Sequence, residues 1–209
     1  MIAETLIIIG AALALIYQLR GAGAEHPGPL AVAAKTGATA ALALAGLAAG
    51  APTAIVLGLA FGALGDFWLT RRGEAAFLAG MAAFAAGHLA YAGWMLTPGH
   101  VARIIWVLPM VVLALSTEVW LLPHTGALKG PVRAYVWVIT LMAAVATTLP
   151  LPLWPAMLGA ALFVVSDLLL ALRLFVARGA QTQRRLSQLL WPAYWGGQAL
   201  ILAGALRAA

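Results

Sequence analysis

The amino-acid sequence predicts an all-α protein: a polytopic membrane helix bundle of eight transmembrane helices, with both termini outside. Three observations predict this fold class. The chain of 209 residues is 64% hydrophobic and only 9% charged, whereas soluble domains are close to half apolar and about a quarter charged. Its apolar residues form stretches near the ~20 residues that cross a bilayer. Its basic residues gather on alternate connections between these stretches, as the positive-inside rule describes for a multi-pass protein.

Glycine, proline and charged residues divide the chain into successive helices. The first carries Glu4 where a signal peptide has positive charge, and no clear cleavage site follows, so we expect a retained span. Short breaks at 50–53 (GAPT), 70–74 (TRRGE) and 149–152 (LPLP) separate later helices, and Pro109 can kink the fifth. We predict a single domain over 1–209, with spans at 2–19, 30–50, 52–70, 75–96, 102–123, 131–149, 151–175 and 186–206.

The distribution of lysine and arginine predicts the orientation of these helices. Only Arg103 and Arg207 fall on the side of the even-numbered connections. The other ten of the twelve basic residues lie on or beside the odd-numbered connections: Arg20, Lys35, Arg71, Arg72, Lys129, Arg133, Arg173, Arg178, Arg184 and Arg185. We therefore expect an integral membrane protein, in a bacterial-type inner membrane, with its odd-numbered connections in the cytoplasm.

The composition excludes several classes of function. The net charge of +6 is spread between apolar stretches without a basic face or a nucleic-acid motif, so we expect no nucleic-acid partner. The absence of cysteine excludes disulfides, thiol nucleophiles and zinc–thiolate sites. His26, His88, His100 and His124 are scattered, with no HExxH motif, and no GxSxG elbow is present. We predict no metal and no cofactor.

Two aspartates inside apolar helices are the strongest candidates for chemistry. An ionisable group within a span costs at least ~2.5 kcal/mol and usually faces a partner or a cavity. Asp66 and Asp167 lie in the inner parts of the third and seventh predicted helices, which run in the same direction, so the two carboxyl groups have matched depths. A carboxylate is too short to reach the interface easily, so we interpret both aspartates as functional.

Other polar residues share this part of the membrane and define a predicted polar chamber toward the cytoplasmic leaflet. His88 and Tyr91 share a face of the fourth helix at i and i+3, as Tyr194 and Gln198 do at i and i+4. The further candidates are Lys35, Glu118, Arg133, Tyr135, Ser166 and Arg173. Alternatives remain open: Lys35, Arg133, Arg173 and Tyr194 are also suited to be interfacial anchors, and Glu118 to pair with Lys129 or Arg133 near the surface.

Two carboxyl groups in a partly desolvated site do not ionise together easily, so one is expected protonated and the other charged. Such a pair supplies a general acid and a general base, which suits hydrolysis of acetals, enol ethers or peptides. Intramembrane aspartyl proteases carry GxGD and YD motifs. Here Ala63 replaces the first glycine and Ser166 the tyrosine, so both motifs fail and a protease is not expected.

From about Lys35 to Ile201 the sequence resembles the YhhN family of membrane proteins, which includes the lysoplasmalogenases. The resemblance rests on GLAFGALGDFWL (58–69), FLAGMAAFAAGHLAYAGW (77–94), PVRAYVWVITLM (131–142), LFVVSDLLLALRLF (162–175) and YWGGQALI (194–201). Departures from the family pattern are Thr36 in place of a usual proline, Arg173 at or next to a frequent asparagine, and Gly196 and Gly197 before Gln198.

The resemblance implies an eight-span hydrolase that cleaves the vinyl-ether bond of lysoplasmalogens to a fatty aldehyde and a glycerophospho-alcohol. One of Asp66 and Asp167 would be the protonated acid; the other, ionised, would stabilise the cation and activate water. The orienting residues would be His88, Tyr91, Tyr135, Tyr194 and Gln198. Lys35, with Arg133 or Arg173, would hold the phosphate. The expected partners are the lysophospholipid substrate and membrane lipid.

Two rival hypotheses remain from the sequence. A proton-coupled lipid or small-molecule transporter would use the two aspartates as a proton relay, and a faint repeat of LGDFWL in VSDLLL favours it. A non-catalytic membrane scaffold would tolerate alanine at the polar positions.

Overall fold

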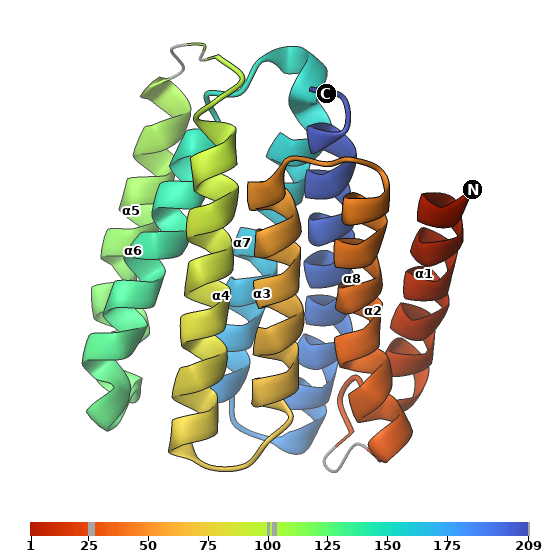
Figure 1. Cartoon of the computed structure of the whole chain (residues 1–209). Coiled ribbons are helices and arrows are strands. Elements are labelled where there is room, and N and C mark those ends of the chain that lie inside the picture. Colours follow the sequence, from red (N-terminus) through yellow and green to blue (C-terminus); the bar gives the residue numbers. More distant parts are fainter. Residues whose placement is uncertain (25–27, 100, 102–103, 209) are drawn as a thin grey trace.

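The computed structural model describes residues 1–24, 28–99, 101 and 104–208, and all regular structure in these residues is helical. His26, His100 and Arg103 lie outside the described residues. Figure 1 shows the eight α-helices, which are α1 (Ile2–Arg20), α2 (Pro29–Ala48), α3 (Thr53–Leu69), α4 (Glu74–Met95), α5 (Ile104–Trp120), α6 (Lys129–Ala146), α7 (Trp154–Ala171) and α8 (Ala180–Ala205). Short helical turns at η1 (Leu122–His124), η2 (Gly126–Leu128), η3 (Leu151–Leu153) and η4 (Leu172–Val176) complete the connections.

The sequence signals that predicted the breaks also begin the helices. Pro29 occupies the first turn of α2, where the missing N–H of proline costs no hydrogen bond. Gly73 and Gly179 precede α4 and α8 with φ of 101° and 95°, a backbone conformation that disfavours any other residue. The all-α prediction is confirmed, and the helix boundaries differ from the predicted spans by a few residues.

Six of the described helical segments are long and apolar enough to cross a membrane, by length and composition alone. They contain α1, α2, α4, α5, α6 and α7. The apolar α3 has only 17 residues. The 26-residue α8 begins with the polar stretch 181–185. A polytopic helical bundle is therefore supported, while eight spans and the location of the termini stay predictions.

The helices pack into a ring that sequence order does not reveal. Successive neighbours are α2, α3, α4, α6, α7 and α8, and α8 returns to contact α2. Helix α1 packs outside the ring on α2 and α5 packs outside on α6, at opposite sides of the bundle (Figure 1). The helices that carry the two aspartates, α3 and α7, thus belong to the same ring without being neighbours in it.

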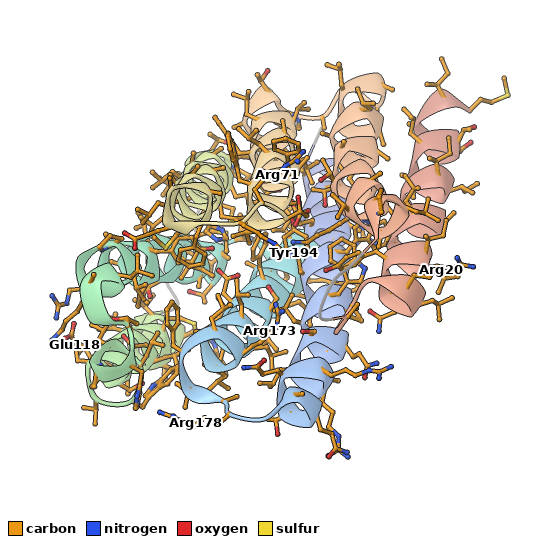
Figure 2. The ribbon with its side chains drawn as sticks, turned by 90° about the horizontal axis from the view of Figure 1, so that it is seen from below. Arg20, Arg71, Glu118, Arg173, Arg178 and Tyr194 are labelled. Carbon is orange, nitrogen blue, oxygen red and sulfur yellow. The ribbon has the colours of Figure 1, made fainter. Side chains whose placement is uncertain are left out.

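Both termini lie at one end of the bundle, and the α1–α2, α3–α4, α5–α6 and α7–α8 connections lie at the other (Figure 1). This second end carries arginines, including Arg20, Arg71, Arg173 and Arg178 (Figure 2). We call it the arginine end. Asp66 and Asp167 lie three and four residues before the ends of α3 and α7 respectively, and both helices run toward the arginine end. Their depths therefore match.

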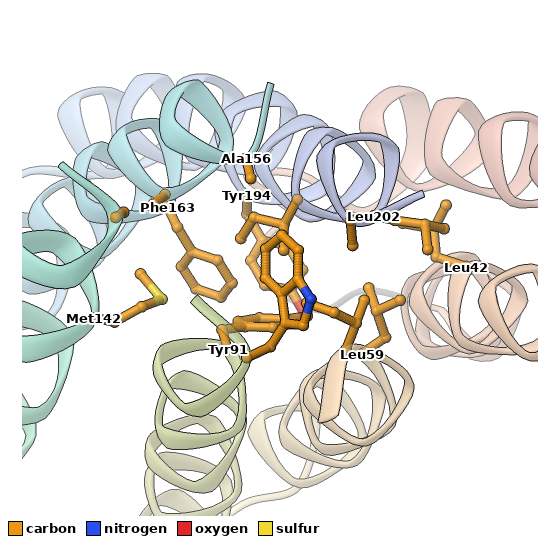
Figure 3. Close-up of a cluster of buried hydrophobic side chains, with 14 of the residues drawn as sticks. Leu42, Leu59, Tyr91, Met142, Ala156, Phe163, Tyr194 and Leu202 are labelled. Carbon is orange, nitrogen blue, oxygen red and sulfur yellow. The ribbon is translucent and has the colours of Figure 1, made fainter. Parts of the chain in front are cut away.

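Small residues allow the close helix packing that positions the site. A Cβ added at Gly159 of α7 would lie 2.5 Å from the carbonyl oxygen of Gly197 on α8, so the two backbones are in contact. On α3, Gly58 and Gly62 instead leave room for the side chains of Tyr91 and Gln198, which a Cβ at either position would contact too closely. Beyond the aspartates the ring interior is filled by a hydrophobic cluster that includes Leu42, Leu59, Met142, Phe163 and Leu202 (Figure 3).

Candidate active site

The carboxylate of Asp66 is buried among hydrogen-bond donors. Its side chain is 1% exposed, and Lys35 Nζ lies 3.1 Å from Oδ1. The hydroxyls of Thr39 and Tyr194 each donate to Oδ2 at 2.8 Å. Helices α2, α3 and α8 therefore converge on this group. A carboxylate accepts about four hydrogen bonds, so three donors, one of them cationic, suit the ionised form of Asp66 and leave room for one more.

Asp167 has a different environment. Tyr135 OH lies 2.6 Å from Asp167 Oδ2, and His88 Nε2 lies 3.0 Å from Tyr135 OH and 3.4 Å from Asp167 Oδ2. Both partners can donate or accept. When Asp167 is ionised, His88 can donate a hydrogen bond to Tyr135 OH, which donates to Asp167. When Asp167 is protonated, the direction reverses: Asp167 donates to Tyr135 OH, which donates to His88 Nε2. His88 Nδ1 is buried without a hydrogen-bond partner in the described residues in both cases, so the contacts of Asp167 are compatible with either protonation state of its carboxyl group.

Both aspartates line one polar cavity of about 530 Å³. The residues after α1 and α3 that also line it, including Gly23 and Arg72, place the cavity at the arginine end. Among the predicted site residues, those on its wall are Lys35, Asp66, Ser166, Asp167, Arg173 and Tyr194. A polar cavity between helices far apart in sequence therefore contains part of the predicted set.

The cations around the cavity are not equivalent. Lys35 is paired with Asp66. Arg173, Arg71 and Arg72 line the cavity, and none of them has a carboxylate within ion-pairing distance among the described residues. Arg71 lies over the ring of Phe67 at 4.4 Å. Arg173 lies near the middle of the arginine end in Figure 2. These arginines are available to an anionic ligand.

Tyr91 and Gln198, two further residues that the sequence predicts for the site, pack behind the aspartates. Tyr91 OH donates to Gln198 Oε1 at 2.6 Å, and both side chains are fully buried and absent from the wall of the polar cavity. Phe163 packs edge-on between His88 and Tyr194, with ring centroids 4.5 and 5.3 Å away. The ring of Tyr91 lies 6.5 Å from that of Phe163, so Phe163 connects this pair with the partners of both aspartates. Ser166 donates to Phe163 O within α7 at 2.7 Å.

Glu118 and Arg133 stand apart from the site. Arg133 donates to both oxygens of Glu118, at 2.6 and 2.7 Å, and the two side chains are 41% and 42% exposed. Neither lines the polar cavity, and Glu118 lies at the outer edge in Figure 2. Of the two interpretations that the sequence left open for Glu118, the structure shows the surface ion pair. Arg133 is likewise occupied outside the cavity.

Sequence reasoning missed Thr39 and the aromatic wall of the cavity. Thr39 follows Lys35 by four residues and so shares its face of α2, which is the signal that could have found it. Tyr17 and Trp191 line the cavity, and their rings meet at 4.4 Å. No sequence pattern links α1 with α8, so this contact was not predictable.

The geometry can support proton transfer to and from one bound molecule. A fixed carboxylate and a carboxyl group with a reversible hydrogen-bond chain face the same space, which is the arrangement that acid–base catalysis requires. Within the described residues, no group of three His, Asp or Glu side chains is arranged to hold a metal ion.

Comparisons with known proteins agree with the resemblance. Residues 30–205, most of the chain, match the model of the YhhN family. Proteins named lysoplasmalogenase from Mycobacterium bovis and Mycobacterium tuberculosis are each 31% identical over 137 residues, 62% of this chain and 51% of theirs. The chain therefore spans about half the length of these curated relatives. No solved structure matches it. On the family match, this chain belongs to the YhhN family.

Proposed function

We propose that this protein hydrolyses the vinyl-ether bond of lysoplasmalogens, giving a fatty aldehyde and a glycerophospho-alcohol. One observation carries the proposal: Asp66 and Asp167, from different helices, line one cavity, and their partners differ. Asp66 is paired with a cation, which favours its ionised form, whereas the partners of Asp167 are compatible with either protonation state. An enol ether is inert to nucleophiles until its β-carbon is protonated, so its hydrolysis needs an acid first and a base second. The two relatives named lysoplasmalogenase support the same reaction class.

Asp167 is the acid in this mechanism. It donates its proton to the β-carbon, the carbon–carbon double bond is lost, and the α-carbon becomes an oxocarbenium-like electrophile. Tyr135 and His88 stabilise the new carboxylate because each can turn a donor toward it. The charged carboxylate of Asp66 faces the same cavity and stabilises the positive charge that develops.

Asp66 then acts as the base. Water adds to the α-carbon and loses a proton to Asp66. The resulting hemiacetal breaks its bond to the glycerol oxygen, which takes the hydroxyl proton, so aldehyde and alcohol leave. One proton passes from Asp66 back to Asp167 through the cavity, and the site is restored.

The phosphate of the substrate binds at the arginine end. The sequence predicts Lys35 with Arg133 or Arg173 as the phosphate ligands. Lys35 and Arg133 are occupied by Asp66 and Glu118, so Arg173 binds the phosphate, with Arg71 and Arg72 on the same wall. Guanidinium groups bind phosphate through paired N–H donors. On this assignment Arg173→Ala raises KM more than it lowers kcat.

Aldehyde release from an alkenyl lysophospholipid by the purified protein in detergent tests the proposal. Asp66→Asn and Asp167→Asn are each expected to lower kcat by at least about 10²-fold, the usual contribution of an acid or base. Glu118→Gln is the matched control, because it changes an exposed carboxylate outside the cavity. Full activity in both aspartate variants, with unchanged thermal unfolding, would refute the two-carboxylate mechanism; no aldehyde from the unmodified protein would refute the reaction.

A proton-coupled transporter is the second candidate. It is favoured by the position of both aspartates near the same ends of two parallel helices, one in each half of the chain. Turnover in detergent separates the two functions, because a carrier has no second compartment there and forms no product.

A further inference from the structure

A second space in the bundle is apolar and adjoins the polar cavity. It has a volume of about 110 Å³ and lies between α4, α5, α6 and α7. Its walls include Met81, Met110, Ala114, Ile139 and Ala143. We call it the apolar pocket.

Away from Tyr135 and Asp167, the two threonines on its wall present little polarity to it. The hydroxyls of Thr117 and Thr140 donate to carbonyl oxygens of their own helices, Ala114 O at 2.6 Å and Val136 O at 2.7 Å. With these hydroxyls bonded to their own helices, the methyl groups are the rest of the two threonine side chains. The lining residues run from Met110 to Trp120 on α5 and from Val132 to Ala143 on α6, a length of about 16 Å along a helix. The pocket is therefore elongated along the bundle.

The apolar pocket and the polar cavity meet at Asp167. Six residues line both spaces: Leu69, Phe77, Phe84, Asp167, Leu170 and Leu174. Asp167 is the only carboxylate on the wall of the apolar pocket among the described residues. A ligand that fills both spaces must therefore change from apolar to polar beside this side chain.

We infer that the apolar pocket holds the single hydrocarbon chain of a lysophospholipid whose head group occupies the polar cavity. This inference rests on the proposed function and adds the chain site to it. The cations of the polar cavity bind the phosphate, and the chain lies between α5 and α6 on the other side of Asp167. The first carbons of the chain, where the vinyl ether stands, then lie against the proposed acid.

The same geometry determines which lipids bind. Of the two spaces, one is apolar and elongated, and it accommodates one hydrocarbon chain beside the head group. A second chain on the glycerol would have to lie in the polar cavity, against Lys35, Arg173 and the two aspartates. We therefore expect two-chain phospholipids with the same head group to bind more weakly.

Photolabelling tests this inference without any hydrolysis. The probe is a saturated 1-O-alkyl lysophosphocholine with a diazirine at the end of its chain, applied to the purified protein in detergent. Labelled residues are expected within 110–121 and 132–143. Excess unlabelled alkyl lysophosphocholine should displace the probe, and the corresponding two-chain ether phosphocholine should displace it less. Labelling elsewhere, no labelling, or equal displacement by the two-chain lipid would overturn the inference.

A pair of adjacent substitutions on α5 gives an independent measurement. Ala114 is 4% exposed and faces the apolar pocket, whereas Leu115 is 54% exposed and lines neither space. Ala114→Phe should lower the displaceable labelling by about tenfold or more, because the added ring occupies the chain site. Leu115→Phe should leave it unchanged. An equal effect of both variants, or none from Ala114→Phe, contradicts the assignment.

The two proposals fail separately. If the pocket is labelled displaceably but the protein releases no aldehyde, the lipid site is supported and the reaction is refuted. If the protein releases aldehyde but the labelled residues lie outside the pocket, the reaction is supported and the chain site is refuted.

Discussion

The ion pair between Lys35 and Asp66 gives the most direct physical test of the site. The two charged atoms are 3.1 Å apart, and the side chains are 13% and 1% exposed. At an effective dielectric constant of about 20, their attraction is about 5 kcal/mol. Removing one partner of a buried pair typically costs about 3–5 kcal/mol, because the other charge is left unpaired.

Lys35→Met is therefore expected to destabilise the protein strongly. A loss of about 3–5 kcal/mol corresponds to a fall of roughly 6–20 °C in the unfolding temperature of a chain of this size. Thermal unfolding in detergent, followed by intrinsic fluorescence, measures it. Arg133→Met is the control, because it breaks an ion pair whose side chains are exposed and so should change stability little.

The double variant Lys35→Met/Asp66→Asn distinguishes the cause. If the cost arises from the unpaired Asp66 carboxylate, neutralising that carboxylate should restore much of the lost stability. A double variant that is no more stable than Lys35→Met would refute this reasoning, as would equal losses in Lys35→Met and Arg133→Met.

Two further predictions concern residues on the helices that surround Asp66. Gly58→Ala places a Cβ 2.3 Å from the ring of Tyr91 and should cost about 1–3 kcal/mol in thermal unfolding, whereas Gly93→Ala enters open space and should cost nothing. Equal unfolding temperatures for the two variants would contradict the packing argument. Tyr194→Phe removes one of three donors to Asp66 and should lower kcat for aldehyde release by about tenfold or more, with little change in KM. An unchanged kcat would show that this hydroxyl does not act on the carboxylate.

Much of the fold was predictable because it depends on local composition. Apolar stretches of membrane-spanning length and the breaks between them are properties of neighbouring residues, so the helical class and the approximate boundaries followed from them. The depth of Asp66 and Asp167 was predictable for the same reason. Successive helices reverse direction, and the third and seventh therefore run the same way.

The partners of those aspartates were not predictable. Lys35, Tyr135 and Tyr194 were candidates at a similar depth, but depth does not say which helices are lateral neighbours. That choice depends on close packing at small residues, such as Gly159 against Gly197, which brings α7 onto α8. Glu118 and Arg133 show the consequence, since they share the depth of the site but face away from it.

The sequence by itself determined that this chain is helical, that its basic residues belong to alternate connections, and that two carboxyl groups lie at one depth. The tertiary structure alone decided that Asp66 is surrounded by donors, that Asp167 joins a reversible chain to His88, and that an apolar pocket meets the polar cavity beside it. The reason is physical: hydropathy acts along the chain, whereas the site is made by side chains from helices that only packing brings together.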